Sequence, residues 1–201
     1  MSEDRGKSGR LKWDPLILLL IVGTAALPFG LARSRQERRW SNERAAATAL
    51  KTISTAEWDL HENDRDGNGI KDYWTADLTE LCRLGLIQKQ VAAADRRPRT
   101  RIVPHPVPFA GYYFEALTAD ASETPPEPYC NNTDGKSGAV HHFHRFGFVA
   151  YPAEPGITGN RIFIINQYNS HWSLPAEGNT VPRNWPPDSD AIHWNRCSGG
   201  G

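Results

Sequence analysis

The sequence predicts an α+β protein in which a long N-terminal helix packs on a small antiparallel β-sheet. Three observations favour this class. An uncharged segment, residues 15–32, leads into a helical pattern with one apolar stripe, and aromatic, β-branched runs appear only in the second half of the chain. Helices followed by strands are typical of α+β domains, in which a helix covers the apolar face of the sheet.

The first expected element is a membrane-spanning helix over residues 15–33, preceded by a basic segment, 1–14. Its length is near the lower limit of the roughly 17–25 residues that cross a bilayer as a helix. Charges stand on both sides of it: Arg10, Lys12 and Asp14 before, and Arg33, Arg35, Arg38 and Arg39 after. Because both sides are basic, charge does not define the orientation. A cleaved signal peptide is the alternative, since Thr24-Ala25-Ala26 offers small residues near the end of the apolar core.

Residues 34–62 predict an amphipathic helix that continues from the anchor, with a bend at Pro28. Its apolar positions recur at three- and four-residue steps, and the resulting stripe includes one acid. The members of the stripe are Ala46, Ala49, Leu50, Ile53, Ala56, Glu57 and Leu60. We expect this face to cover the sheet.

Residues 63–174 predict an α+β head. A polar loop, 63–72, comes first, and a short helix then begins at Asp77, with Glu80 at the capping-box spacing. Proline-rich residues 95–108 predict an extended connection. Strands are expected at residues 111–117, 139–151 and 160–167, separated by loops at 122–138 and 152–159. Their aromatic side chains follow the strand period and are expected to pack in the sheet core.

The last segment, residues 175–201, is rich in Pro, Asn, Ser and Gly and predicts a loosely packed or disordered tail. Trp172, Trp185 and Trp194 suit either a protein or glycan contact or, as we expect, capping of the open end of the sheet.

The composition argues against two classes of function. The chain has 23 Lys and Arg and 23 Asp and Glu, and its basic excess is confined to the segments that flank the apolar helix. We therefore expect a membrane and no nucleic acid as partner. The sequence contains no Gly-x-Ser-x-Gly elbow and no Gly-rich phosphate loop, so we expect no catalytic activity and identify no small-molecule substrate.

Three cysteines, Cys82, Cys130 and Cys197, lack the spacing of a zinc or redox motif. In an exported head Cys130 and Cys197 are the expected pair, because both fall in loop-like sequence. Three reduced thiols are the alternative.

The loop after the helix is the strongest candidate for a site, and the expected ion is calcium. Its ligands would be Asp64, Asp66, Asn68, the carbonyl of Ile70 and Asp72, at positions 1, 3, 5, 7 and 9 of a calcium loop. Thr75 stands where such loops carry a bidentate Glu, so Asp77 is the ligand that the site could borrow. The alternative is a turn that Asp, Asn and Gly form for backbone reasons alone.

A second candidate is the run His141-His142-x-His144, in which His142 and His144 share one face of a strand. A zinc ion would need further ligands that the sequence does not place there. We prefer a polar, partly exposed strand face. An exported metal-binding module or metal-dependent enzyme that uses the Asp64 loop or the His142/His144 strand is nevertheless the alternative function.

Two stretches of the N-terminal half follow a known pattern: Leu27-Pro28-Phe29-Gly30-Leu31-Ala32-Arg33-Ser34-Arg35 and Ser41-Asn42-Glu43-Arg44-Ala45-Ala46-Ala47-Thr48-Ala49-Leu50-Lys51-Thr52-Ile53-Ser54-Thr55-Ala56-Glu57. Through these residues the N-terminal half resembles the type IV pilin and type II secretion pseudopilin superfamily. The head is similar to an uncharacterised exported bacterial domain, through Gly111-Tyr112-Tyr113-Phe114-Glu115-Ala116-Leu117, residues 146–154 and residues 159–166.

The resemblance implies a pilin-like structural or assembly protein of the cell envelope. It would be held by a single pass in the inner membrane, with the head on the periplasmic side, and its partners would be other envelope or pilin-like subunits. A prepilin leader ends in Gly, with Glu at the fifth position of the mature helix. Here Gly9 precedes Asp14 by five residues, but Arg10 and Lys12 stand where that family has apolar residues.

Overall fold

The protein is described by a computed structural model over residues 15–100, 105–133, 139–187 and 194–197, without the side chains of residues 15–32, 132, 133 and 139. The predicted basic segment 1–14, with Gly9 and Asp14, lies outside these residues. The chain divides into two compact units, Met1–Glu37 and Arg38–Gly201.

The helix α1 extends over Pro15–Asn63 without interruption, which confirms a helix across the two predicted segments 15–33 and 34–62. In the first unit, Arg33 Nε donates to Glu37 Oε1 at 3.0 Å, one turn along the same helix. Where side chains are described, no helix combines the length and the apolar character needed to cross a bilayer. The predicted span, with the expected bend at Pro28, has its side chains outside the described set up to residue 32.

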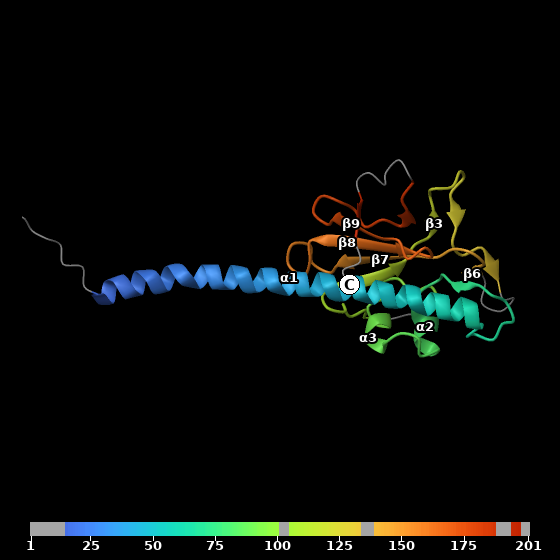
Figure 1. The fold of residues 1–201 in the computed structure, drawn as a ribbon, viewed down its shortest axis with the longest axis horizontal. Coiled ribbons are helices and arrows are strands. Elements are labelled where there is room, and N and C mark those ends of the chain that lie inside the picture. The colour runs from blue at the N-terminus through green and yellow to red at the C-terminus, as the bar shows by residue number, and fades with distance from the viewer. Residues whose placement is uncertain (1–14, 101–104, 134–138, 188–193, 198–201) are drawn as a thin grey trace, which may run out of the picture. The chain divides into compact units, whose positions relative to one another are not determined.

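The second half of α1 covers one face of a sheet, as its stripe predicts. Every member of the stripe is buried: Ala46, Ala49, Leu50, Ile53, Ala56, Glu57 and Leu60. The apolar members join one core with the sheet residues Tyr112, Phe114, Phe148, Ala150, Phe163 and Ile165. In Figure 1, three strands of the sheet lie on one side of this part of α1: β7 (Gly147–Pro152), β8 (Arg161–Asn166) and β9 (His171–Pro175). The short helices α2 (Thr79–Arg83) and α3 (Lys89–Ala92) lie on the other side.

The main sheet has five antiparallel strands in the order β11-β9-β8-β7-β2. Their bounds are β2 Tyr112–Ala116, β7 Gly147–Pro152, β8 Arg161–Asn166, β9 His171–Pro175 and β11 Asn195–Arg196. The predicted strands 111–117 and 160–167 are confirmed as β2 and β8. The loop 152–159 is confirmed as the connection between β7 and β8.

The predicted strand 139–151 is wrong as a single element, because the chain turns after His142. It forms β6, Ala139–His142, and then β7, which belongs to a different sheet. The backbone N–H groups of His144 and Arg145 both donate to Nδ1 of His142, at 3.0 and 2.9 Å, and hold the turn. A side chain that binds its own backbone in this way stops the strand.

Two small sheets complete the fold. One has the order β1-β6-β5, with β1 at Tyr73–Trp74 and β5 at Asn132–Thr133. The other has the order β10-β3-β4, with the bounds Asn184–Trp185, Ala119–Asp120 and Glu127–Pro128.

The short helix α2 begins at Thr79 and ends at Arg83, and α3 follows over Lys89–Ala92. The predicted start at Asp77 is wrong by two residues, because the N-cap is Leu78, without a side-chain cap, and Asp77 Oδ1 instead accepts from the Thr79 N–H at 2.9 Å. Glu80 instead forms an ion pair with Arg83, so the reciprocal half of the capping box is not formed. Gly85, at φ +74°, follows α2 in the left-handed conformation expected at a helix end.

The far face of the main sheet carries a second core, and the C-terminal segment covers it. Leu117, Tyr129, Val149, Ile162 and Ile164 pack there with Ala176, Trp185 and Trp194. The prediction of a loosely packed tail is therefore wrong at Ala176, Trp185 and Trp194, which are buried, while most other described residues of the tail are exposed. The two tryptophans cover the far face of the sheet, and not its open end as expected.

Candidate metal centre

The loop between α1 and β1 is organised by its own side chains. Both carboxylate oxygens of Asp64 accept from the Gly69 N–H, at 3.2 and 3.1 Å. Asn68 Oδ1 accepts from the Ile70 N–H at 2.6 Å. Gly67 and Gly69 supply positive φ angles, +70° and +81°, that other residues adopt only under strain. The oxygens of Asp64 and Asn68 thus shape the turn, which is the backbone use that Asp and Asn have in loops.

Two of the predicted calcium ligands, Asp66 and Asp72, meet a histidine that the calcium pattern does not include. One ligand atom from each of Asp66, Asp72 and His141 lies within 4.8 Å of the other two. His141 Nε2 is 3.3 Å from Asp66 Oδ2. Asn68 bridges the carboxylates, because its Nδ2 donates to Asp66 Oδ2 at 3.0 Å and lies 3.5 Å from Asp72 Oδ1.

Strand pairing brings the three residues together across nearly 80 positions of sequence. Asp72 immediately precedes β1, and β1 pairs with β6 so that Trp74 faces His141 in the antiparallel register. The indole of Trp74 packs edge-on against the His141 ring, with the ring centroids 5.1 Å apart. The β1–β6 strand pairing and the ring contact with Trp74 therefore hold His141 beside the loop.

The cluster concentrates negative charge in a place with little water. Burial raises the pKa of Asp66, and the neighbouring carboxylates of Asp72 and Asp64 act in the same direction, while His141 and the Asn68 N–H oppose them. Glu57 of α1 is completely buried, and that burial, with the charge of Asp72, raises its pKa well above the ordinary value. One of its oxygens, Oε2, accepts from the Trp74 N–H at 3.0 Å, and the other, Oε1, has no hydrogen-bond partner.

Asp77, the ligand that the calcium loop was expected to borrow, is used elsewhere. Its Oδ2 accepts from the N–H groups of Arg99 and Thr100, at 2.9 and 2.7 Å, and its Oδ1 accepts from Trp74 Nε1 at 3.3 Å. Asp77 therefore ties α2 to the connection that follows α3.

His142 and His144 do not point toward the cluster. His142 Nε2 lies 3.1 Å from Glu127 Oε1, and its Nδ1 accepts the two turn N–H groups, so both ring nitrogens have partners. Burial lowers the pKa of His142. The expectation of a partly exposed strand face is wrong for His141 and His142, which are 1% and 2% exposed, whereas His144 is exposed.

The three cysteines are free thiols, and the expected pair Cys130–Cys197 is not formed. Cys130 Sγ instead contacts Arg99 Nη1 at 3.0 Å. Cys197 follows β11, and its backbone N–H donates to the His171 carbonyl at 2.8 Å.

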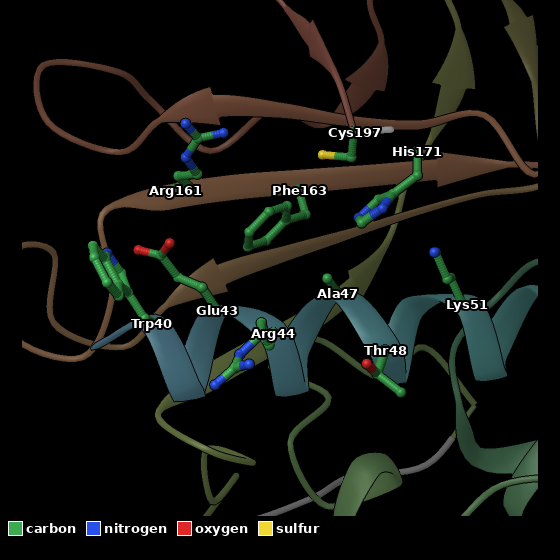
Figure 2. A pocket seen from close by; sticks show the side chains of 10 residues that line it. All are labelled: Trp40, Glu43, Arg44, Ala47, Thr48, Lys51, Arg161, Phe163, His171 and Cys197. Carbon is green, nitrogen blue, oxygen red and sulfur yellow. The ribbon is translucent and has the colours of Figure 1, made fainter. Parts of the chain in front are cut away.

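A groove of about 720 Å³ is lined by residues of α1, of strands β8 and β9 and by Cys197, and it shares no lining residue with the cluster of Asp66, Asp72 and His141. Figure 2 shows Phe163 and His171 facing α1 from the sheet, and Lys51 rising from α1 toward His171. Burial lowers the pKa of His171 to about 4, with a smaller contribution from the charge of Lys51. The remaining lining residues are Trp40, Glu43, Arg44, Ala47, Thr48, Arg161 and Cys197.

The fold and the cluster define an α+β protein whose long helix meets the head beside a set of buried acids and one histidine. A family model described as a protein of unknown function, DUF2950, matches residues 26–173. The match covers well over half of the chain, so the chain belongs to this family. Comparisons with curated proteins and with solved structures found no match.

Sequence reasoning missed the role of His141, because it took His142 and His144 as the pair that share a face. The alternation of a strand places His141 on the opposite face from His142, and this signal was available. Glu57 was visible as the single acid within an apolar stripe, which is a sequence signal for a buried charge.

Proposed function

We propose that this chain is a membrane-anchored, pilin-like structural or assembly protein of the bacterial cell envelope, without catalytic activity. It would cross the inner membrane once and hold its head on the extracytoplasmic side. One observation carries the proposal. A single helix, α1, joins an uncharged sequence, residues 15–32, to a stripe of side chains that is buried against the sheet.

The physical argument starts from the uncharged sequence. Eighteen consecutive residues without a charge cannot stay in water at low cost, so lipid or other helices must cover them. The helix that contains them is firmly attached to the head, because Leu50, Ile53 and Leu60 are almost completely buried.

Contacts with other subunits are part of the proposal, and α1 offers side chains for them. Trp40 is 56% exposed on α1, although indoles are usually covered. Trp58, nearer the C-terminal end of the same helix, is 42% exposed, and its Nε1 donates to the Gln167 carbonyl at 3.0 Å. Exposed aromatic residues of this kind are enriched where proteins meet.

An exported metal-binding module is the second candidate function. The close approach of Asp66, Asp72 and His141 favours it, and a metal in that position is compatible with an anchored structural protein as well.

The anchor is tested on the full chain in bacterial cells, with a C-terminal tag on the head. We expect the protein in the membrane fraction, extracted by detergent but not by high salt or alkaline carbonate. The doubly substituted variant Leu19→Arg/Ile21→Arg should lose most of its membrane association, because each arginine at the centre of a span costs about 3 kcal/mol on insertion scales. The matched control Gln36→Arg/Ser41→Arg adds the same charge at two exposed positions of α1 and should leave fractionation unchanged.

Protease added to intact and to permeabilised cells then reports the side on which the head lies, and mass measurement reports the N-terminus. Cleavage of the head in cells whose outer membrane alone is permeabilised, with Met1 retained, agrees with the anchored form. Full-length protein dissolved in the cytosol, or a chain cut after residue 26 and released, contradicts it.

A further inference from the structure

Asp66, Asp72 and His141 come from three separate pieces of backbone, yet their ligand atoms lie within one small space. Asp66 is in the loop after α1, Asp72 immediately precedes β1, and His141 is on β6. Their ligand atoms lie within 4.8 Å of one another, whereas ligand atoms around one tetrahedral ion are roughly 3.4 Å apart, so small side-chain movements would bring all three onto one ion. The β1/β6 register fixes two of the three positions, so the arrangement does not depend on the loop alone.

The state of His141 is an independent sign that a ligand is needed. Its side chain is 1% exposed, and neither ring nitrogen has a hydrogen-bond partner, although Nε2 faces Asp66 Oδ2 at 3.3 Å. A buried polar group without a partner costs roughly 1–3 kcal/mol of folding free energy. Its neighbour His142 is equally buried but has partners on both nitrogens. The two neighbouring histidines of β6 therefore differ: both are buried, but only His141 lacks hydrogen-bond partners, on the face of the strand that meets the loop.

Charge around the cluster points to a cation. Asp66, Asp72 and Glu57 bring three carboxyl groups into a region with little water. The basic side chains of the same loop are bound to other acids: Lys71 Nζ is 3.3 Å from Glu62 Oε2, and Arg65 Nη2 is 2.9 Å from Asp59 Oδ2. Arg83 acts on Asp66 only from an exposed position, where it pairs with Glu80.

We infer that Asp66, Asp72 and His141 bind one divalent transition-metal ion of the zinc class. Imidazole nitrogen together with carboxylate oxygen suits zinc and similar ions, whereas calcium takes oxygen ligands throughout. A calcium loop would use Asp64 and Asn68 as ligands, but here their side-chain oxygens accept hydrogen bonds from the Gly69 and Ile70 N–H groups. Three protein ligands leave a fourth position of the tetrahedral set for water.

The bound ion would fasten the end of α1 to the small β1-β6-β5 sheet. It supplies His141 with a partner and compensates the carboxylates, so it stabilises the fold at this junction, and its fourth position stays open to water. This site does not rest on the proposed membrane anchor, and its test is independent of where the protein resides.

The test uses the full-length chain, purified in detergent and stripped with a chelator. Zn²⁺ and Ca²⁺ are titrated separately by calorimetry, and Co²⁺ is added as a spectroscopic substitute. We expect one Zn²⁺ per chain, a Co²⁺ absorption band of the tetrahedral type, and thermal unfolding that shifts upward with Zn²⁺. Binding of Ca²⁺ with no preference for Zn²⁺, or no metal binding because a protonated His141 pairs with Asp66, overturns the inference.

Variants identify the ligands. His141→Gln and Asp72→Asn should each weaken Zn²⁺ binding by about 100-fold, the upper end of the losses found when residues that merely orient a ligand are changed. His142→Gln is the matched control, because it is the next residue, equally buried, and faces Glu127. Equal loss in His142→Gln contradicts the assignment. Circular dichroism shows which variants fold, and if His141→Gln does not, the shift of the His141 ring signals by Zn²⁺ in the wild-type NMR spectrum decides.

Discussion

The two faces of the main sheet are covered in different ways. On one face, α1 contributes a regular stripe that includes Leu50 and Ile53, both completely buried. On the other, an irregular segment contributes a few separated side chains, of which Trp185 and Trp194 are the largest, each 9% exposed. Both arrangements exclude water from a sheet face, but only the first uses one long regular element, whereas the second uses loops and the two-residue strands β10 and β11.

This difference explains why the sequence predicts the packing of α1 on the sheet but not the packing of the C-terminal segment on the opposite face. A helix repeats its buried side about every 3.6 residues, so its stripe is visible in the sequence without knowledge of its partner. The C-terminal segment has no period, and its Pro, Asn, Ser and Gly content is the same as that of a disordered tail. Its order comes from tertiary contacts, such as the short parallel pairing of β10 with β3. Composition alone could not show those contacts.

The largest expected effect is on the helix-covered face. Leu50→Ala should lower the free energy of unfolding by about 4 kcal/mol, because it leaves a cavity between α1 and the sheet. Thr52→Ala, at an exposed position of the same helix, should change it by less than about 0.5 kcal/mol. Denaturant unfolding of the full chain in detergent measures both, and a loss below about 1 kcal/mol for Leu50→Ala would mean that α1 does not pack as described.

On the other face, Trp185→Ala should lower the free energy of unfolding by about 3 kcal/mol, since the indole fills a fully apolar cluster. The effect is smaller than for Leu50 because an irregular segment can settle partly into the space. Val181→Ala provides the comparison within the same segment, since Val181 is 37% exposed. Equal small effects from both variants would restore the expectation of a loosely packed tail. The measurement is again unfolding by denaturant, followed by tryptophan fluorescence for Val181→Ala and by circular dichroism for both.

The candidate site was predictable in part for the same reason as the fold. Asp66 and Asp72 belong to a local pattern of alternate oxygen ligands, and local patterns survive in the sequence. The contribution of His141 depends on the pairing of a two-residue strand with β6, and on a turn at residues 143–145 that splits a long aromatic run. Strand alternation separates His141 from His142, but short strands leave almost no periodic signal for their partners, so the position of His141 beside Asp66 and Asp72 becomes visible only in the folded chain.

The smallest expected effect is a pH dependence of the unfolding free energy, which comes from a histidine on the helix-covered face. His171 lies on the helix-covered face, 5% exposed, with its ring centroid 5.5 Å from that of Phe163 and with Lys51 of α1 nearby. Its pKa is lowered to about 4 in the folded protein, mainly by burial, against about 6.5 in an unfolded chain.

As the pH falls through the pKa of His171 in the unfolded chain, the unfolded chain takes up a proton that the folded chain does not. The folded state therefore loses about 2 kcal/mol between pH 7 and pH 5 from this group. The variant His171→Gln should lack that part of the slope, and the difference between the two unfolding curves measures it. Parallel curves for wild type and variant would show that His171 is protonated in the folded protein, and that the α1 face is more hydrated than its buried stripe indicates.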